Sequence, residues 1–513
     1  MWALIQNRRI KRLATLEVGQ EQTAALSNRT NGLELGSPAA DGNGCIWVRI
    51  RDETDQLDPK NWTLLSRFKN IVILSLLIFA QAWAGSADSQ ANERASREFG
   101  VSQTAENLST AMYLFGISSG SLFAGPFSES IGRNPTYLVS TLMFLLFVLG
   151  SARTRTFAGQ VICRYFVGLS SSATLSINGS SVGDQFRPVK RAFVFPMIAW
   201  ANIAGPTISP IVGGWVVSNP DLDWRWTEYI TLIISAFTWV VALLFLPETY
   251  LPILLDWKSR QVRRETGDER YACGPTSSLY QRLKDIVPLP IIFFSTEPVI
   301  SVLGAYLVLL YCILFTFLSG FDYIFKRTYN MSIAQTGSCF GAIAAGATVA
   351  TFAAPGLYKW ARRKTHYEHG AALPPEFRLW PAIIASPFLP ISLFWLGWTN
   401  SPTVSVWSSL LACGLFGAVL ISIYISSYEY IIDSYGKHAA SALASITMVR
   451  YLIAGGMVLA ARPMYERIGV HWTMTILGSI SLLLAPMPLL FKIYGTRLRK
   501  RSRYAESPTA GPD

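Results

Sequence analysis

The stretch that decides the fold is Gly125-Pro126-Phe127-Ser128-Glu129-Ser130-Ile131-Gly132-Arg133. It separates two apolar runs, at roughly residues 107–127 and 136–152, that are each long enough to cross a lipid bilayer. Glycine and proline favour a tight reversal of the chain between the two runs. Glu129 and Arg133 hold an acid and a base four residues apart, and a short charged loop between two membrane-length helices puts this pair at the face of a membrane.

The composition of the whole chain also indicates a membrane protein. Of the 513 residues, 51% are hydrophobic and 15% are charged, which is too apolar over too great a length for one soluble core. The net charge of +12 comes from basic residues between the apolar runs and in the tails, so we expect a lipid bilayer and no nucleic acid as partner. Six cysteines without paired spacing and four histidines without metal spacing predict no disulfide, no metal site and no cofactor.

The apolar segments predict twelve membrane-spanning helices of about 17–25 residues each. The predicted spans are 69–88, 107–127, 136–152, 158–182, 191–217, 226–246, 296–320, 334–356, 379–398, 404–430, 438–461 and 471–493. The fold class is therefore an all-α polytopic membrane protein with two six-helix halves. The domains are a largely disordered tail at 1–66 with a turn-rich middle at 36–44, a first half at 67–247, a linker at 248–292, a second half at 293–494 and a tail at 495–513.

Charge bias predicts that both tails and the linker are cytoplasmic. Basic residues gather before the first span, between the fourth and fifth, after the sixth and eighth, and at the end of the chain. Arg153, Arg155, Lys326 and Arg327 fall on the other side and weaken this bias without reversing it. Residues 258–264 of the linker could form a short amphipathic helix on the inner membrane surface. The sequons at Asn107 and Asn330 would lie outside, where glycosylation can occur.

Two arginines inside apolar spans are candidates for function. A guanidinium in hydrocarbon is costly, so Arg164 in the fourth span and Arg450 in the eleventh should face a cavity and pair with an acid or a carbonyl, unless they snorkel to an interface. The acids that could reach the cavity are Asp88, Glu297 and Glu429. Aromatic candidates for the cavity wall are Trp83, Tyr113, Trp200, Tyr306, Tyr311 and Tyr424, although any of them could instead serve packing or face lipid.

Several motifs resemble the major facilitator superfamily. The opening stretch is similar to its loop between helices 2 and 3, G-x-L-A-D-R-x-G-R, with Glu129 in place of Asp and Phe127 in place of Leu. Arg164 and Gly168 match its R-x-x-x-G motif. The fifth span resembles the antiporter motif of drug:proton antiporters through Gly205, Pro206, Pro210, Gly213 and Gly214, with Ser209 replacing one glycine. Asp58-Pro59-Lys60-Asn61-Trp62 and Asp223-Trp224-Arg225-Trp226 narrow the resemblance to the fungal twelve-helix branch of multidrug and polyamine exporters.

The resemblance implies roles for individual residues. It predicts an inner gate formed by Gly125, Glu129, Gly132, Arg133, Asp184, Arg191 and Asp433. Arg133 should lie within salt-bridge reach of Asp184, and Glu129 near the start of the eleventh helix. It also implicates Arg164 in proton coupling; because an arginine stays charged, an acid must carry the proton, and Glu297 is preferred because it matches a family position. The two prolines of the fifth span predict the clearest broken helix of the first half.

The function expected from these observations is secondary transport without any catalytic residue. The chain should export small amphipathic organic molecules, such as drugs, toxins, secondary metabolites or polyamines, in exchange for protons by alternating access. We expect a monomer, in the plasma membrane or alternatively the vacuolar membrane. The alternatives are a proton symporter or facilitator importing a nutrient, and a membrane sensor that does not transport. An enzyme is not expected, because no convergent His, Ser and Asp set or metal set is present.

Overall fold

A computed structural model describes residues 5–15, 46–48, 55–272, 284, 287–364, 374–502 and 504. The described part of the first half holds α2 (Leu64–Ala84), α3 (Asn92–Phe99), α4 (Gln103–Ile131), α5 (Arg133–Arg153), α6 (Phe157–Gly183), α7 (Pro188–Ser218) and α8 (Trp226–Phe245). All of these except the eight-residue α3 are long enough to cross a bilayer. The first half therefore supplies six long helices, as predicted.

The second half contains more interrupted helices. They are α11 (Leu289–Thr296), α12 (Pro298–Phe321), the π-helical turn η2 (Asp322–Arg327), α13 (Ile333–Lys364), η3 (Pro375–Leu379), α14 (Trp380–Ala385), α15 (Phe388–Thr399), α16 (Val406–Tyr435), η4 (Gly436–His438), α17 (Ala439–Leu484) and α18 (Met487–Arg501). The ninth span is divided between α14 and α15, whose boundary contains Pro387. The long α17 holds two spans, because Gly469 inside it has the non-helical angle φ 81°.

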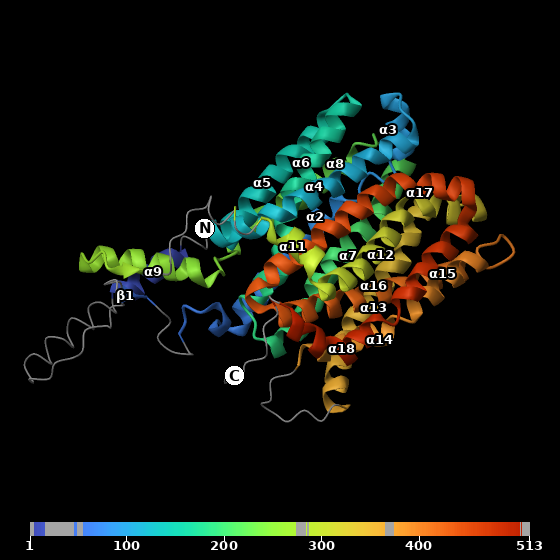
Figure 1. The fold of residues 1–513 in the computed structure, drawn as a ribbon. Helices are drawn as coiled ribbons and strands as arrows, with labels where there is room; N and C mark the ends of the chain where they lie inside the picture. The colour runs from blue at the N-terminus through green and yellow to red at the C-terminus, as the bar shows by residue number, and fades with distance from the viewer. Residues whose placement is uncertain are drawn as a thin grey trace, which may run out of the picture.

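Nine segments of the described chain are apolar and long enough to count as membrane spans by composition alone. One of the nine, Ala439–Lys500, contains both the eleventh and the twelfth span. The helices α4 and α6 are as long as the others but richer in serine and glycine, as expected of helices that line a path through the protein. With these two, the described helices form the twelve-helix bundle that the sequence predicts (Figure 1).

The two halves meet along two helix pairs. α4 packs against α17, and α7 packs against α13, so each pair brings one helix from either half. We call the end of the bundle that contains Gly132, Asp184 and Tyr250 the linker end, and the end that contains Phe99 and Thr154 the far end. Figure 1 shows α9 (Leu251–Thr266) projecting beyond one end of the bundle and α3 at the opposite end. The charge bias predicts that the linker end is cytoplasmic.

The deciding stretch is organised differently from the expectation. Gly125 and Pro126 do not reverse the chain; they lie inside α4, which continues to Ile131. The reversal falls on Gly132 alone, which has φ 111°, a conformation that residues with a Cβ rarely adopt. A proline costs a helix one backbone donor and a clash with the preceding turn, whereas a residue with positive φ ends it.

The fifth span is not broken. α7 runs continuously over 31 residues with Pro196, Pro206 and Pro210 inside it. Pro210 cannot donate to the carbonyl of Pro206, and that carbonyl instead accepts a 2.9 Å hydrogen bond from the hydroxyl of Ser86. A neighbouring side chain thus satisfies the freed backbone group, which is how prolines are tolerated in membrane helices.

The tail and the linker contain more structure than predicted. Residues 5–15 form a helix, although the tail was expected to be largely disordered, and its turn-rich middle at 36–44 lies outside the described residues. Ile10 of this helix packs against Leu57 and against Leu254 of α9. The amide of Gln6 also exchanges two hydrogen bonds with the backbone of Glu248, at 3.0 and 2.9 Å. α9 contains the predicted amphipathic stretch, and the two-residue strands β1 (Ile46–Trp47) and β2 (Tyr271–Ala272) pair in parallel beside it.

The cysteines do not contradict the expectation of free thiols. Cys163, Cys312, Cys339 and Cys413 are all unpaired, while Cys45 and Cys273 lie outside the described residues.

Candidate functional site

Ion pairs around Asp433 hold the two halves together at the linker end. Asp433 lies in the last turn of α16, and its Oδ1 contacts Arg191 of α7 in the other half. Its Oδ2 lies 2.7 Å from Nε of Arg378, whose Nη2 donates a 2.7 Å hydrogen bond to the carbonyl of Pro188 in the first half. Two of these contacts cross between the halves, so the halves are joined at this end of the bundle.

Arg133, the first residue of α5, makes a second set of contacts at the same end. Its Nε lies 3.0 Å from Oδ2 of Asp184, which ends α6, so the predicted distance is found. Glu129 lines the same cleft as Ala439 and Ala440 at the start of α17, the region where it was expected. The geometry therefore agrees with an inner gate, and the gating role itself stays a prediction.

Glu248 is a buried acid of the linker end that the sequence reasoning did not single out. Its two carboxylate oxygens accept hydrogen bonds from the backbone N–H groups of Arg133 at 3.0 Å and Asn134 at 3.1 Å. A carboxylate at this position complements the positive end of the α5 dipole. Burial raises the pKa of Glu248 above its ordinary value, and hydrogen bonds from four backbone amides oppose that shift. A Cβ at Gly132 would lie 2.5 Å from Glu248 Oε2, so glycine is needed there for space as well as for backbone conformation.

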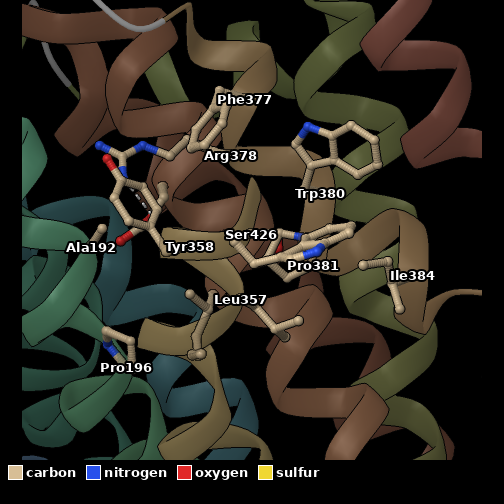
Figure 2. A pocket seen from close by; sticks show the side chains of 14 residues that line it. Ala192, Pro196, Leu357, Tyr358, Phe377, Arg378, Trp380, Pro381, Ile384 and Ser426 are labelled. Atoms are coloured by element: carbon tan, nitrogen blue, oxygen red, sulfur yellow. Dashed lines mark hydrogen bonds and ion pairs between the residues drawn. The ribbon is translucent and has the colours of Figure 1, made fainter. Parts of the chain in front are cut away.

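Arg378 is a second charged residue of the linker end that is missing from the prediction. It lies in η3, is nearly fully buried, and its Nη1 lies 3.1 Å from Oε2 of Glu429 in addition to its contact with Asp433. Figure 2 shows it at one wall of a cavity between α7, α13, α14 and α16, with its guanidinium close to Tyr358. In the sequence Arg378 is one more basic residue beside a span, and nothing local distinguishes it from the other positive-inside residues.

A cluster of buried charged residues surrounds Arg164 near the far end. Arg164 is buried and its Nη2 contacts both Asp88 and Glu228, the second at 2.6 Å. Its Nη1 donates a 2.9 Å hydrogen bond to the carbonyl of Ala84. The arginine thus pairs with acids and with a carbonyl and does not snorkel to the surface.

Two acids of this cluster were not predicted. Glu228 is 1% exposed and accepts a 2.8 Å hydrogen bond from Ser151. Glu106 is 2% exposed, accepts a 3.2 Å hydrogen bond from Gln160, and lies close enough to Glu228 for their charges to repel. Each acid stands within one turn of the start of its helix, where a sequence pattern cannot tell a buried carboxylate from a solvated helix cap.

The remaining predicted acids lie away from Arg164. Glu297, the preferred proton carrier, is buried at the start of α12 and accepts a 3.0 Å hydrogen bond from the hydroxyl of Tyr435 at the linker end. Glu429 pairs with Arg378 at the linker end. Of the three candidates, the structure brings only Asp88 to Arg164.

Arg450 differs from the expectation, because it has neither an acid nor a carbonyl as partner. It is fully buried, and within the described part of the chain its guanidinium forms no ion pair and no hydrogen bond of good geometry, although the hydroxyl of Tyr451 is close enough to interact with it. Four tyrosines surround it, with ring centroids 4.0 to 5.8 Å from its Cζ: Tyr311 of α12, Tyr424 and Tyr428 of α16, and Tyr451 of α17. We call Arg450 and these four tyrosines the arginine cage. Tyr311 and Tyr424 were among the predicted cavity-wall residues.

The glycines of the antiporter-like segment bring α7 close to helices of both halves. A Cβ at Gly205 would lie 2.7 Å from the backbone nitrogen of Trp83 in α2. A Cβ at Gly214 would lie 3.0 Å from the carbonyl of Ile333 in α13. α7 therefore seals against its own half and the opposite half at once, and a larger side chain at either glycine would force the helices apart.

The two sequons differ in accessibility. Asn330 is exposed, in a loop after η2. Asn107 lies in the first turn of α4, and its Nδ2, the atom that would be glycosylated, is buried. Only Asn330 is suitably placed for modification of the folded protein.

Comparisons with known proteins agree with this architecture. Residues 64–458 match the family model of the Major Facilitator Superfamily. The MFS-type transporter kojT of Aspergillus flavus is 40% identical over 455 residues, which cover 88% of this chain and 81% of that protein. The efflux pump FUBT of Fusarium oxysporum is 30% identical over 455 residues, covering 87% and 76% of the two chains.

A solved structure supports the same fold. The proton:xylose symporter XylE of E. coli superimposes with a TM-score of 0.62 over 84% of this chain and 97% of its own, at 14% sequence identity. The family-model match and the relatives settle the family: the chain belongs to the major facilitator superfamily and is a multi-pass membrane transporter.

Proposed function

We propose that this transporter exports small amphipathic organic molecules in exchange for protons, by alternating access of its two halves. It would act as a monomer in the plasma membrane. Two observations support export rather than import. The closely packed α7 resembles the antiporter motif, and one relative is named an efflux pump.

The observation that carries proton coupling is the excess of buried acid around Arg164. Three buried carboxylates lie near one guanidinium: Asp88 and Glu228 contact Arg164, and Glu106 lies close to Glu228. Like charges brought together in a low-dielectric environment disfavour full ionisation, so the group favours holding a proton. Because an arginine does not give up its own proton, the exchangeable proton resides on a carboxylate.

The geometry suggests Asp88 and Glu228 as the exchanging pair. Both contact Arg164 Nη2, so neutralising one carboxylate leaves the other as its counter-charge. Asp88 follows α2 and Glu228 begins α8, whereas Arg164 belongs to α6. Protonation would therefore loosen contacts among three helices of the first half, which is a means of linking proton binding to movement of that half.

Transport by purified protein in proteoliposomes tests the proposal. Wild-type protein should accumulate substrate against its gradient when a pH gradient is imposed, screened over drugs, polyamines and fungal secondary metabolites. Asp88→Asn and Glu228→Gln should abolish accumulation but retain exchange of labelled for unlabelled substrate, which needs no net proton movement. Asp221→Asn removes an exposed acid and serves as the control that should behave as wild type.

Three outcomes would contradict the proposal. Normal pH-driven accumulation by Asp88→Asn and Glu228→Gln would exclude the Arg164 cluster as the coupling site. Substrate movement in the same direction as the protons would indicate a symporter. Absence of any transport would favour a sensor.

A further inference from the structure

The arginine cage is built from helices of the second half and contacts α7 of the first half. The hydroxyl of Tyr311 donates a 2.7 Å hydrogen bond to Oδ1 of Asn202 in α7, and so reaches into the first half. Phe195 of α7 stacks on Tyr428, with ring centroids 6.0 Å apart. Side chains of the first half therefore pack against two tyrosines of the cage and would move away from them whenever the halves separate.

Arg450 is exceptional among the buried arginines. The others in the described part of the chain are Arg67, Arg133, Arg164, Arg191, Arg378 and Arg499, and each makes an ion pair or a hydrogen bond with a carbonyl. Arg450 is 0% exposed, and among the described residues it has neither an acid nor a carbonyl as acceptor; the neutral hydroxyl of Tyr451 is close enough to interact with it. The aromatic faces around it give some compensation through cation–π contacts, but they accept no N–H hydrogen bond in the guanidinium plane.

A buried charge without a counter-charge is costly, and arginine cannot avoid the cost by losing a proton. Asn202 adds to the imbalance, because its Nδ2 is also buried and without an acceptor. The site thus offers several unsatisfied donors and one positive charge. An acceptor with negative charge is the chemical group that would satisfy them.

We propose that the arginine cage binds the transported molecule, and that this molecule is an organic anion with a planar conjugated body. A carboxylate would pair with the guanidinium in two parallel hydrogen bonds. Its ring would lie among the tyrosine faces, as in other aromatic sites for flat ligands. A polyamine would meet the positive charge of Arg450 with no acid of the cage to offset it, so polycations are disfavoured.

This inference rests on the proposed transport function for its biological meaning, but its test does not require a proton gradient. The full-length protein is purified in detergent, and binding of three probes of equal ring size is measured from the shift in melting temperature: 2-naphthoate, 2-naphthamide and 2-naphthylmethylammonium. Wild-type protein should bind the naphthoate more tightly than the neutral amide, and the ammonium most weakly. Arg450→Gln should weaken naphthoate binding by about 10- to 100-fold, as loss of a charged hydrogen-bonded pair predicts, with little effect on the amide.

The controls separate charge at the cage from charge in general. Arg97→Gln removes one positive charge from a side chain that is 76% exposed and should leave all three affinities unchanged. Arg450→Lys keeps the charge without the paired donors and should give an intermediate naphthoate affinity. The comparison of the three probes on wild-type protein needs no variant, so a folding failure of Arg450→Gln cannot prevent the test.

The inference is overturned if naphthoate does not bind, if it binds no better than naphthamide, or if Arg450→Gln binds it as wild type does. These results differ from those that refute proton exchange. Arg450-dependent naphthoate binding without pH-driven transport would contradict the proposed function alone. Transport driven by pH with preference for the amide or the ammonium would contradict only the anion site.

Discussion

Replacing Asp433 by asparagine should open the linker end of the bundle. Asp433 belongs to the second half and contacts Arg191 of the first half directly. It also orients Arg378, which donates a hydrogen bond to the carbonyl of Pro188 in the first half. The substitution removes the negative charge with almost no change in side-chain volume, so its effect reports the ion pairs rather than packing.

The size of the effect can be worked from these contacts. A hydrogen bond involving a charged group contributes about 1.5–3 kcal/mol, and the Asp433 side chain is only 13% exposed, so screening by salt is small. Of the two ion pairs that Asp433 makes, only the one with Arg191 crosses between the halves, and Arg378 retains Glu429 at 3.1 Å. Asp433→Asn should therefore shift the balance between closed and open linker end by about 10- to 100-fold toward the open state.

A single reporter cysteine measures this shift. Ala440 lines the cleft beside Asp433, so Ala440→Cys, in a background without the native cysteines, should react with a maleimide faster by a comparable factor when Asp433→Asn is present. Asp223→Asn removes an exposed acid at the far end and should leave the rate unchanged. An unaltered labelling rate in Asp433→Asn, with an unaltered melting temperature, would show that these ion pairs do not hold the gate closed.

Four further predictions concern other parts of the molecule. A Cβ at Gly455 would lie 2.6 Å from a ring carbon of an aromatic side chain of α4, whereas a Cβ at Gly456 would meet nothing within 4 Å. Gly455→Ala should therefore slow transport and Gly456→Ala should not. Equal transport rates for the two variants would contradict the packing argument. Arg225 holds the pKa of Glu98 below its ordinary value. The stability that Glu98 contributes is therefore present above about pH 4 and is lost as the pH falls through the folded-state pKa. Glu98→Gln should flatten this part of the plot of melting temperature against pH, and an unchanged plot would refute the argument. Asn330→Gln should abolish any electrophoretic shift caused by enzymatic deglycosylation, and a persisting shift would mean that another site is used. Export of a monovalent anion in exchange for one proton would move two elementary charges across the membrane in one direction, and the membrane potential would contribute about 4.6 kcal/mol per 100 mV to each transport cycle. A membrane potential imposed with valinomycin should therefore change the transport rate. A transport rate that does not respond to the potential would exclude this stoichiometry.

The sequence predicted the fold well because membrane spans leave a strong local signal. A run of about 20 apolar residues has few alternatives to a helix in lipid, and basic residues between the runs set the predicted orientation. The errors in the predicted helices arose at single residues that determine the local backbone conformation. Pro126 and Pro210 were expected to interrupt helices, but a freed carbonyl can be satisfied from a neighbouring helix, as Ser86 satisfies Pro206. Such a partner is 120 residues distant in sequence and leaves no local pattern.

The charged sites were harder to predict because their meaning depends on partners. Glu248 and Arg378 each stand beside a span, where most charged residues are solvated, and only the folded chain turns one toward the N-terminus of α5 and the other toward Asp433. Glu228 is distinguished from an ordinary helix cap only by Arg164, which reaches it from another helix.

Arg164 and Arg450 also show that the role of a buried charge depends on partners that the sequence does not reveal, and they do so in opposite ways. Both are arginines inside apolar spans, and the same reasoning about the cost of a buried charge applied to each. Folding supplies Arg164 with two acids of its own half, and so makes it part of a closed set whose charge can change only by binding a proton. Folding gives Arg450 four aromatic rings and no acid, and so leaves its charge to be balanced from outside the chain. The first arrangement suits a proton and the second an anion. Two tyrosines of the anion site also contact Asn202 and Phe195 of the other half, so it is the anion site that would sense directly whether the halves have closed.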